Sequence, residues 1–238
     1  LVWRLAIRLR EGAGRTRPQR ACSMSIDEAP PSVAVPERIG RFVVDRPLGR
    51  GGMSRTYRCT LEGMGGFRKL VLLKMLAPEH SRDDHFRRMF LDEAHLSAHL
   101  VHPNIAQVFE VGEELGVPWL AMEYVAGPDL ARVSKRLRTQ GGRHCGHAAR
   151  LFADVCRGLD AAHRVRGGDG RRMGVVHRDV SLGNVVVSPE GVAKLIDFGI
   201  AWSRVKANTT DVGVLKGKLH YMAPEQLTET VDHRLDIY

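Results

Sequence analysis

The sequence has no run of 18 apolar residues and no pair of cysteines spaced C-x-x-C. The first absence excludes a membrane-spanning helix within this stretch, because a helix needs about 20 mostly apolar residues to cross a bilayer. The cysteines, Cys22, Cys59, Cys145 and Cys156, are scattered, which argues against a zinc site or a disulfide framework. Reduced thiols are typical of the cytosol, so the sequence predicts a cytoplasmic protein.

Lysine is scarce, with 7 lysines against 29 arginines, and the formal net charge of +9 is unevenly distributed. Residues 1–23 hold six arginines and one acidic residue. A basic arm is compatible with nucleic-acid or membrane affinity. However, Met24 opens a plausible natural start, and the excess of arginine points to GC-rich coding. We therefore expect residues 1–23 to be upstream sequence or a disordered arm, and we expect no nucleic-acid partner.

The composition is that of an ordinary globular protein, with 43% hydrophobic and 26% charged residues. A chain of 238 residues is long enough for one substantial domain or two small lobes. Residues 24–40 are rich in proline, alanine and acids and are typical of a linker. We therefore assign residues 1–40 to a basic extension and linker. No internal repeat or low-complexity tract follows.

Residues 41–123 are dominated by short runs with strand-like patterning. These runs are FVVDRPL, TYRCTL, RKLVLLKML, IAQVFEVGEE and VPWLAMEYV, the first two being separated by the glycine-rich turn RGGMS. One helix is expected in RDDHFRRMFLDEAHLSAHL, where apolar residues recur at helical spacing and Asp83 and Asp84 suit the helix start. This part is predicted to form a strand-rich first lobe.

Residues 124–238 have a different texture, with helical spacing in ARVSKRLRTQ and AARLFADVCRGLDAAHRV. The turn-rich segment GGDGRRMG follows, and then two short strands, NVVVS and AKLIDF. We therefore predict an α+β fold with two lobes, the second of them helical and starting at residue 124. Ligands often bind at such a seam between lobes.

One lysine, Lys74, lies inside the apolar strand VLLKML, where an unpaired ammonium group would be costly. The expected helix contains a matching exception. Glu93 falls on its apolar stripe, where a hydrophobic residue is expected. The two opposite charges are tolerable if they pair. The alternative, that Lys74 extends to solvent and Glu93 sits at the edge of the stripe, remains open from this pair alone.

Four motifs follow one another along the chain: LGRGGMSRTY, VVHRDVSLGNVVV, KLIDFG and YMAPEQ. A glycine-rich turn frees backbone N–H groups to approach phosphate oxygens. The oxygen donors Asn184 and Asp197 stand near one strand pair and suit a hard divalent cation such as Mg²⁺. Together with Lys74 and Glu93, in this order and spacing, the set resembles the protein-kinase signature. The resemblance covers about residues 42–238, and its details are similar to bacterial members of the eukaryotic-type Ser/Thr kinase family.

The resemblance implies a two-lobed kinase fold and transfer of the γ-phosphate of ATP to Ser or Thr hydroxyls of proteins, with Mg²⁺. The catalytic residues that it implies are Lys74, Glu93, Asp179, Asn184 and Asp197, with Asn184 and Asp197 as the metal ligands. The nucleotide-binding residues that it implies are Leu48, Gly49, Arg50, Gly51, Gly52, Met53, Ser54, Thr56, Leu72, Lys74, Met122, Glu123, Val125, Asp129 and Val186.

Within that set, the glycine-rich turn would cover the phosphates and Asp179 would accept the proton of the acceptor hydroxyl. The backbone of Glu123 and Val125 would bind adenine behind Met122, and Asp129 would reach the ribose. The adenine ring would lie between three apolar side chains, those of Leu48, Leu72 and Val186.

The stretch between KLIDFG and YMAPEQ is similar to an activation segment. Arg178 precedes the catalytic aspartate, and the resemblance implies that it pairs with a phosphorylated residue of this segment. Ser203, Thr209 and Thr210 are the candidates, with autophosphorylation expected at Thr209 or Thr210; solvated loop hydroxyls are the alternative.

The sequence departs from the family pattern at Ser54, Thr56, Leu72, Ser181 and Lys218. Leu72 stands where alanine is usual and would crowd the adenine ring. Ser181 replaces a lysine that would contact the transferred phosphate, while Lys218 replaces a threonine. We hypothesise that Lys218 supplies the charge missing at Ser181; drift at two tolerant positions is the alternative.

The chain stops at Tyr238, where the family's large central helix begins, and Asp236 would brace the catalytic loop. We expect the helices present to expose a large apolar surface, and the chain expressed alone to be poorly soluble and weakly active or inactive.

Parts of the sequence are also compatible with two other functions. A pseudokinase-like scaffold is favoured by Leu72, Ser181 and Lys218, but it would not need the intact acidic residues. A dinucleotide-binding domain built on Gly49 and Gly51 is disfavoured, because no parallel strand–helix–strand unit surrounds that turn.

Overall fold

The computed structural model describes residues 36–140, 145–198, 223, 225 and 232–237. Its β-strands are β1 (Arg38–Ile39), β2 (Phe42–Arg50), β3 (Ser54–Glu62), β4 (Arg68–Leu76), β5 (Val108–Glu114), β6 (Val117–Glu123), β7 (Val185–Val187) and β8 (Ala193–Leu195). Its α-helices are α2 (Asp84–Ala98), α3 (Leu130–Gln140) and α4 (Cys145–Arg164). Short 3₁₀ helices span Met64–Gly66, Pro78–His80, Leu182–Asn184 and His233–Asp236.

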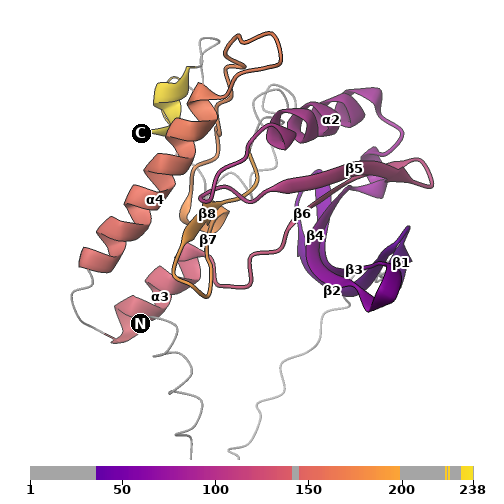
Figure 1. The fold of residues 1–238 in the computed structure, drawn as a ribbon, viewed down its shortest axis with the longest axis horizontal. Helices are drawn as coiled ribbons and strands as arrows, with labels where there is room; N and C mark the ends of the chain where they lie inside the picture. Colours follow the sequence, from indigo (N-terminus) through magenta and orange to yellow (C-terminus); the bar gives the residue numbers. More distant parts are fainter. Residues whose placement is uncertain (1–35, 141–144, 199–222, 224, 226–231, 238) are drawn as a thin grey trace, which may run out of the picture.

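The strands and helices are segregated into two parts (Figure 1). A curled six-stranded sheet, in the order β1-β2-β3-β4-β6-β5, forms one part together with α2. Helices α3 and α4 form the other part, and the β7–β8 pair lies between them and the sheet. This α+β arrangement is the one that the sequence predicts.

The register of the sheet determines which side chains face the seam. Every strand pair in the six-stranded sheet is antiparallel. Val71 and Leu73 of β4 are fully buried in one apolar cluster, so the alternate residues Leu72 and Lys74 point to the opposite face. Thr56 of β3 lies directly across from Lys74. The antiparallel pairing removes the dinucleotide-binding interpretation.

Helix α2 begins where the sequence predicts. The carboxylate of Asp83 accepts hydrogen bonds from the backbone N–H groups of His85 and Phe86, at 2.8 and 3.4 Å, and so caps the helix. The buried residues of α2 are Met89, Phe90, Glu93 and Ala94. Glu93 is thus buried on the apolar stripe and does not lie at its edge.

Two boundaries differ from the sequence-based expectation. The linker prediction missed β1, where Ile39 is 2% exposed and caps one end of the apolar cluster; two residues are too few to show a strand periodicity. Strand β5 starts at Val108 and not at Ile105. Ile105 forms an isolated parallel bridge with Leu195 of β8, and this bridge ties the segment after α2 to the second part.

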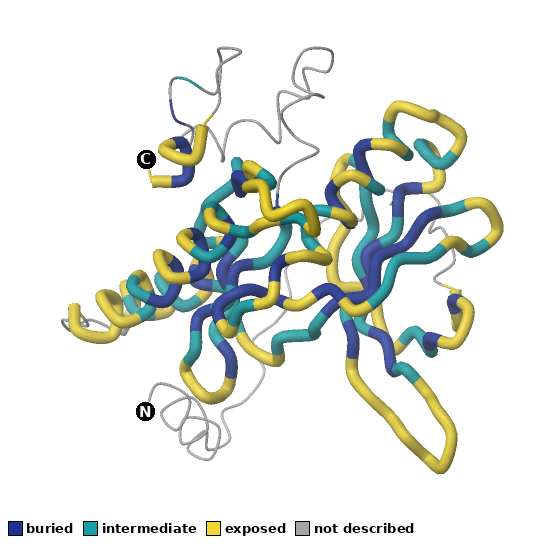
Figure 2. Tube along the Cα trace, turned by 45° about the horizontal axis from the view of Figure 1, so that its top comes forward, coloured by how far each residue is buried: buried dark blue, intermediate teal, exposed yellow. Residues whose placement is uncertain are grey.

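The buried residues are concentrated on the strands and on the inner face of α4 (Figure 2). A Cβ atom added at Gly158 of α4 would lie 2.9 Å from the carbonyl oxygen of Asn104 and 2.9 Å from a methyl carbon of Leu195. The Asn104 side chain in turn donates a hydrogen bond to the Ala193 carbonyl at 2.9 Å. The α2–β5 connection is therefore in close contact with both β8 and α4.

A groove beside α4 exposes apolar side chains. The groove runs between α4, the segment 178–185 and the C-terminal 3₁₀ helix, and Phe152 and Ile237 in its wall are 55% and 73% exposed. This exposed surface agrees with the sequence-based expectation.

No helix in the part of the chain that the structure describes is long and apolar enough to cross a membrane. The described cysteines, Cys59, Cys145 and Cys156, are free thiols.

Gly127 offers a sharp test of the seam. Its added Cβ would lie 1.8 Å from the carbonyl oxygen of Val187, so the segment after β6 lies directly against the backbone of β7. We predict that Gly127→Ala lowers the free energy of unfolding by about 3 kcal/mol, because a backbone atom cannot move aside as a side chain would. Urea unfolding of the purified protein measures this change.

The matched control is Gly146→Ala in α4, where an added Cβ meets no atom within 4 Å. It should stabilise the protein by about 0.5–1 kcal/mol, because alanine favours the helix. Equal stability of the two variants would contradict the close approach at Gly127.

Candidate active site

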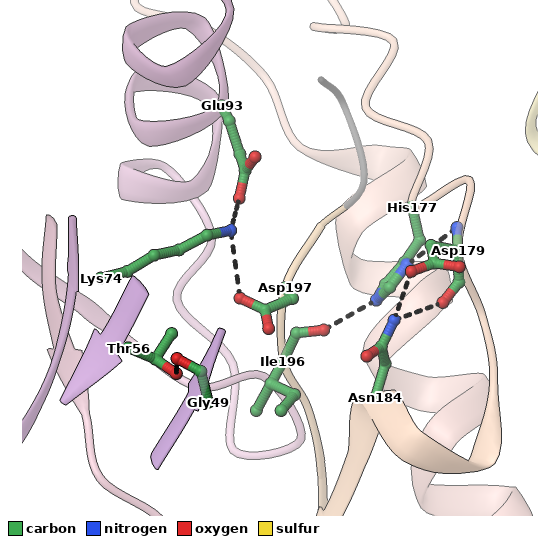
Figure 3. A network of polar contacts seen from close by, with 9 residues as sticks. All are labelled: Gly49, Thr56, Lys74, Glu93, His177, Asp179, Asn184, Ile196 and Asp197. Atoms are coloured by element: carbon green, nitrogen blue, oxygen red, sulfur yellow. Dashed lines mark hydrogen bonds and ion pairs between the residues drawn. The ribbon is translucent and has the colours of Figure 1, made fainter. Parts of the chain in front are cut away.

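Lys74 pairs with Glu93, as the sequence suggested (Figure 3). The Nζ atom of Lys74 lies 2.6 Å from Oε1 of Glu93 and 3.3 Å from Oδ1 of Asp197. Both members of the pair are buried, at 9% and 7% exposure, whereas the Asp197 side chain is 37% exposed. One ammonium group therefore joins the sheet, the helix α2 and the segment after β8.

The protonation states in this cluster follow from its charges. Burial alone would lower the pKa of Lys74, but the carboxylates of Asp197 and Glu93 outweigh it and raise that pKa above its ordinary value. Burial raises the pKa of Glu93, and the Lys74 ammonium opposes that rise. Lys74 is thus a permanent cation, and Glu93 depends on it to stay ionised.

Two backbone positions near the seam are strained. Asp197 and Arg178 have positive φ angles of 53° and 65°, in the left-handed region that non-glycine residues rarely adopt. Each such residue costs about 1–3 kcal/mol, and such strain clusters at functional sites. At Asp197 the turned backbone lets the carboxylate face Lys74 (Figure 3).

His177 is fully buried between the two strained positions. Its Nε2 lies 3.2 Å from the carbonyl oxygen of Ile196, and its Nδ1 lies 3.3 Å from the backbone nitrogen of Asp179. The carbonyl can only accept and the backbone N–H can only donate, so these partners assign the hydrogen to Nε2. Burial lowers the pKa of His177, which favours the same neutral form.

Asp236 holds the backbone of the chain at His177 and Arg178. Its carboxylate accepts hydrogen bonds from the backbone N–H groups of His177 and Arg178, at 2.7 and 2.8 Å. It also lies 2.8 Å from Nε2 of His163 on α4. The bracing role that the family resemblance implied for Asp236 is confirmed, and His163 is an additional member that the sequence analysis did not identify.

Asn184 and Asp179 form a second polar pair. The Asn184 side-chain amide donates to the backbone carbonyl and to Oδ2 of Asp179, at 2.8 and 2.7 Å. The amide nitrogen is therefore occupied, and the amide oxygen Oδ1 is the atom left to act as a metal ligand. The backbone of Ile196 bonds to that of Asn184 at 3.0 Å, which brings Asn184 and Asp197 next to each other.

This donor set fits Mg²⁺ that arrives with a nucleotide. Mg²⁺ usually takes one or two protein oxygens and completes its octahedron with phosphates and waters. Asn184 and Asp197 supply two such oxygens. Among the described residues no group of three His, Cys, Asp or Glu side chains could hold a metal.

The glycine-rich turn connects β2 and β3 above this cluster. The backbone N–H of Gly51 donates to the carbonyl of Ser54 at 2.8 Å, and the Thr56 hydroxyl donates to the carbonyl of Gly49 at 3.2 Å. Leu48 at its base is 38% exposed. Arg50, Gly52 and Met53 complete the turn that the sequence predicts to cover phosphates.

The remaining residues that the sequence predicts to bind the nucleotide lie along the seam between the two parts. Leu72 of β4 faces Met122 across the strand pair, and Val186 of β7 forms a bridge with Asp129. Val125 follows β6, and its carbonyl accepts a hydrogen bond from Gly127 at 2.9 Å.

Two of these residues have partners that sequence reasoning missed. The carboxylate of Glu123 lies 2.7 Å from Nζ of Lys194 on β8. The carboxylate of Asp129 accepts from the backbone N–H of Arg132 at 2.7 Å and so caps α3. An aspartate directly before an amphipathic helix is the signal that could have revealed this cap.

Some predictions fall on residues whose structure is not described. Ser203, Thr209, Thr210 and Lys218 lie outside the described residues, and so does most of the segment before Ala223 and Glu225. The hypothesis that Lys218 compensates for Ser181 therefore stays a hypothesis.

Comparisons with known proteins agree with this geometry. The sequence profile of the family described as "Protein kinase domain" matches residues 42–238. The chain is 40% identical over 204 residues to a tyrosine-protein kinase, MasK, of Myxococcus xanthus, which covers 84% of the chain and 31% of that protein. It is 35% identical over 192 residues to the serine/threonine-protein kinase PknA of Mycobacterium tuberculosis, which covers 79% of the chain and 41% of that protein.

A solved structure shows the same fold. The crystal structure of the M. tuberculosis PknI kinase domain superimposes with a TM-score of 0.60 at 33% identity, over 84% of this chain and 69% of that one. The chain therefore belongs to the protein kinase domain family, and its fold is the two-lobed kinase fold with an incomplete second lobe. It spans 31% and 41% of the length of the two curated relatives named above.

The buried ion pair gives a stability prediction. Lys74→Met should lower the free energy of unfolding by about 3–5 kcal/mol, because it leaves the Glu93 carboxylate buried without a partner. Adding Glu93→Leu should recover at least half of that loss, since both charges are then gone. Lys194→Met is the control, because its partner Glu123 has a 29% exposed side chain and can turn to water. Urea unfolding would contradict the argument if both lysine variants lost the same stability.

His177 gives a pH prediction. Because its pKa is lowered in the folded protein, the unfolded chain binds more protons as the pH falls below about 6.5, the ordinary value for histidine. The contribution of this group is complete above that pH and is lost below it, so stability falls with acidification. His177→Phe should flatten the dependence of the unfolding free energy on pH between about 7 and 5. An unchanged slope would contradict a neutral buried His177.

Proposed function

We propose that this chain carries the catalytic apparatus of a serine/threonine protein kinase, which transfers the γ-phosphate of ATP to protein hydroxyls with Mg²⁺. The observation that carries the proposal is the shared position of Lys74 between Glu93 and Asp197, beside the Asn184–Asp179 pair. A pure scaffold has no need for this arrangement, in which two carboxylates and a strained backbone surround one ammonium group.

The nucleotide would lie in the seam between the two parts. Lys74 would bind the α- and β-phosphates through Nζ, which Glu93 holds in place. The turn from Gly49 to Ser54 would cover the phosphates with its backbone N–H groups. The adenine ring would contact the backbone of Glu123 and Val125 and lie between the side chains of Leu48, Leu72 and Val186, with Met122 behind it and Asp129 toward the ribose.

The metal would be held by Oδ1 of Asn184 and the carboxylate of Asp197. When bound, Mg²⁺ neutralises the negative charge of the phosphates during transfer. Asp179 would orient the acceptor hydroxyl and accept its proton on the carboxylate. Its own position is fixed by Asn184, which bonds to both its carbonyl and its carboxylate.

Serine and threonine are the proposed acceptors, in line with the names of most of the bacterial relatives. Tyrosine is the second candidate, because the relative with 40% identity is described as a tyrosine-protein kinase. Phosphoamino-acid analysis of the phosphorylated product distinguishes the two.

Further parts of the proposal concern the setting of the reaction. The first lobe would span residues 41–123 and the partial second lobe residues 124–238. The reaction would take place in the cytoplasm, where free thiols remain reduced. Thr209 or Thr210 would be autophosphorylated, and Arg178 would form an ion pair with the phosphate group.

The test is phosphate transfer from Mg²⁺-ATP to a generic basic protein. Asp179→Asn should lower kcat by about 10²–10⁴-fold, because the acceptor proton loses its base. The control Asp160→Asn removes an exposed carboxylate of α4 that pairs with Arg164 at 2.8 Å, and it should leave the rate unchanged. Equal transfer by Asp179→Asn and its parent would favour the scaffold function.

A further inference from the structure

The glycine-rich turn is contacted from one side by the segment that follows β4. The backbone N–H of Ala77 donates to the carbonyl of Met53 at 2.8 Å, continuing the β3–β4 ladder by one pair. Nε2 of His80 lies 3.1 Å from the carbonyl oxygen of Gly52, and since a carbonyl only accepts, Nε2 carries the hydrogen. Two carbonyls at the tip of the turn are therefore held from outside the β2–β3 hairpin.

Glu79 makes a second set of contacts in the same place. Its Oε1 lies 3.3 Å from Nη2 of Arg50, and its Oε2 lies 3.2 Å from Nη2 of Arg55. Arg50 is the last residue of β2 and Arg55 is its register partner on β3, so the two like charges stand directly opposite each other. Like charges in that position push the strands apart, and the carboxylate between them removes the repulsion.

The charge of Glu79 is secure in this position. A hydrogen bond from its own backbone N–H, together with the charges of Arg55 and Arg50, lowers its pKa below the ordinary value. The Arg55 side chain is only 13% exposed, so this contact is partly shielded from water, whereas Arg50 is 67% exposed. The Arg55 contact is therefore the less screened by water of the two.

We propose that Pro78–His80 acts as a clasp that holds the glycine-rich turn where its backbone can cover nucleotide phosphates, with Glu79 and His80 as positioning residues. The inference rests on the proposed function in one respect only, namely that the turn covers phosphates. The contacts that form the clasp are made by residues of the protein alone.

The expected effect follows from the conformational freedom of glycine. The turn between β2 and β3 contains Gly51 and Gly52 and therefore has many accessible conformations, and a ligand that orders it loses affinity in doing so. A clasp that orders the turn beforehand removes that loss for ligands with phosphates. Adenosine has no phosphates and does not contact the turn, so its affinity is independent of the clasp.

The experiment compares Glu79→Gln with Glu62→Gln in the otherwise unchanged protein. Glu62 is a close match, because it also bridges two arginines of the same sheet, Arg38 at 3.0 Å and Arg68 at 3.5 Å, away from the turn. Glu79→Gln should weaken ATP binding by about 3- to 10-fold and change adenosine binding by less than about 2-fold. Glu62→Gln should change neither affinity.

A second readout needs no nucleotide. In the ligand-free protein, the backbone amides of residues 51–56 should exchange with deuterium faster in Glu79→Gln than in the parent or in Glu62→Gln. His80→Phe should have the same effect, because a phenyl ring keeps the stacking on Phe86, now at 4.1 Å between ring centroids, but cannot donate to Gly52.

The outcomes separate the clasp from the proposed function. Unchanged exchange of residues 51–56 in both variants would overturn the clasp, whether or not ATP binds. Faster exchange with unchanged ATP affinity would also overturn it, because the turn would then move without affecting the phosphates. A parent protein that binds no ATP but shows faster exchange in the variants would leave the clasp standing and refute the nucleotide site.

Discussion

The structure depends on one ammonium group, Nζ of Lys74, which meets carboxylates from two other segments. Glu93 reaches it from α2 and Asp197 reaches it from the turn after β8. Neither Lys74 nor Glu93 could remain buried without the other, since an isolated charge in a low-dielectric interior is costly. The position of α2 against the sheet and the position of the β8 turn at the seam are thus set by the same atom.

A single carboxylate also holds more than one group in the segment that contains His177 and Arg178. Asp236 accepts hydrogen bonds from the backbone N–H groups of His177 and Arg178. The His177 ring in turn bonds to the carbonyl of Ile196, the residue before Asp197. Asn184 is joined to Asp179 and its backbone to Ile196, so the proposed base and one proposed metal ligand belong to one hydrogen-bonded unit. The other proposed ligand, Asp197, follows Ile196 directly in the chain. A change at any member would displace the others, so preorganisation here is a property of the network.

Sequence reasoning reached this site from the order and spacing of its motifs, and two residues that violate local rules pointed to the same place. Lys74 breaks an apolar strand and Glu93 breaks an apolar stripe, and a violation without a compensating partner would not persist. The longer strands and helices were predictable because long periodic segments show their pattern. Strand β1 was not predictable, because Arg38–Ile39 is too short to show one. The Glu123–Lys194 pair was invisible because neither residue violates its surroundings, and only the fold brings them together.

The connection between β4 and α2 shows how these constraints combine. Lys74 lies near the end of β4 and Glu93 lies in α2, so the segment Pro78–His80 links the two halves of the ion pair along the chain. That same segment touches the glycine-rich turn through Glu79 and His80. A shift of α2 that separated Glu93 from Lys74 would therefore also strain the contacts of Glu79 and His80 with the turn. A shift of the turn would strain the same contacts next to the start of α2. The segment Pro78–His80 therefore connects three parts that are proposed to act on the phosphates: the strand that carries Lys74, the helix that carries Glu93 and the glycine-rich turn.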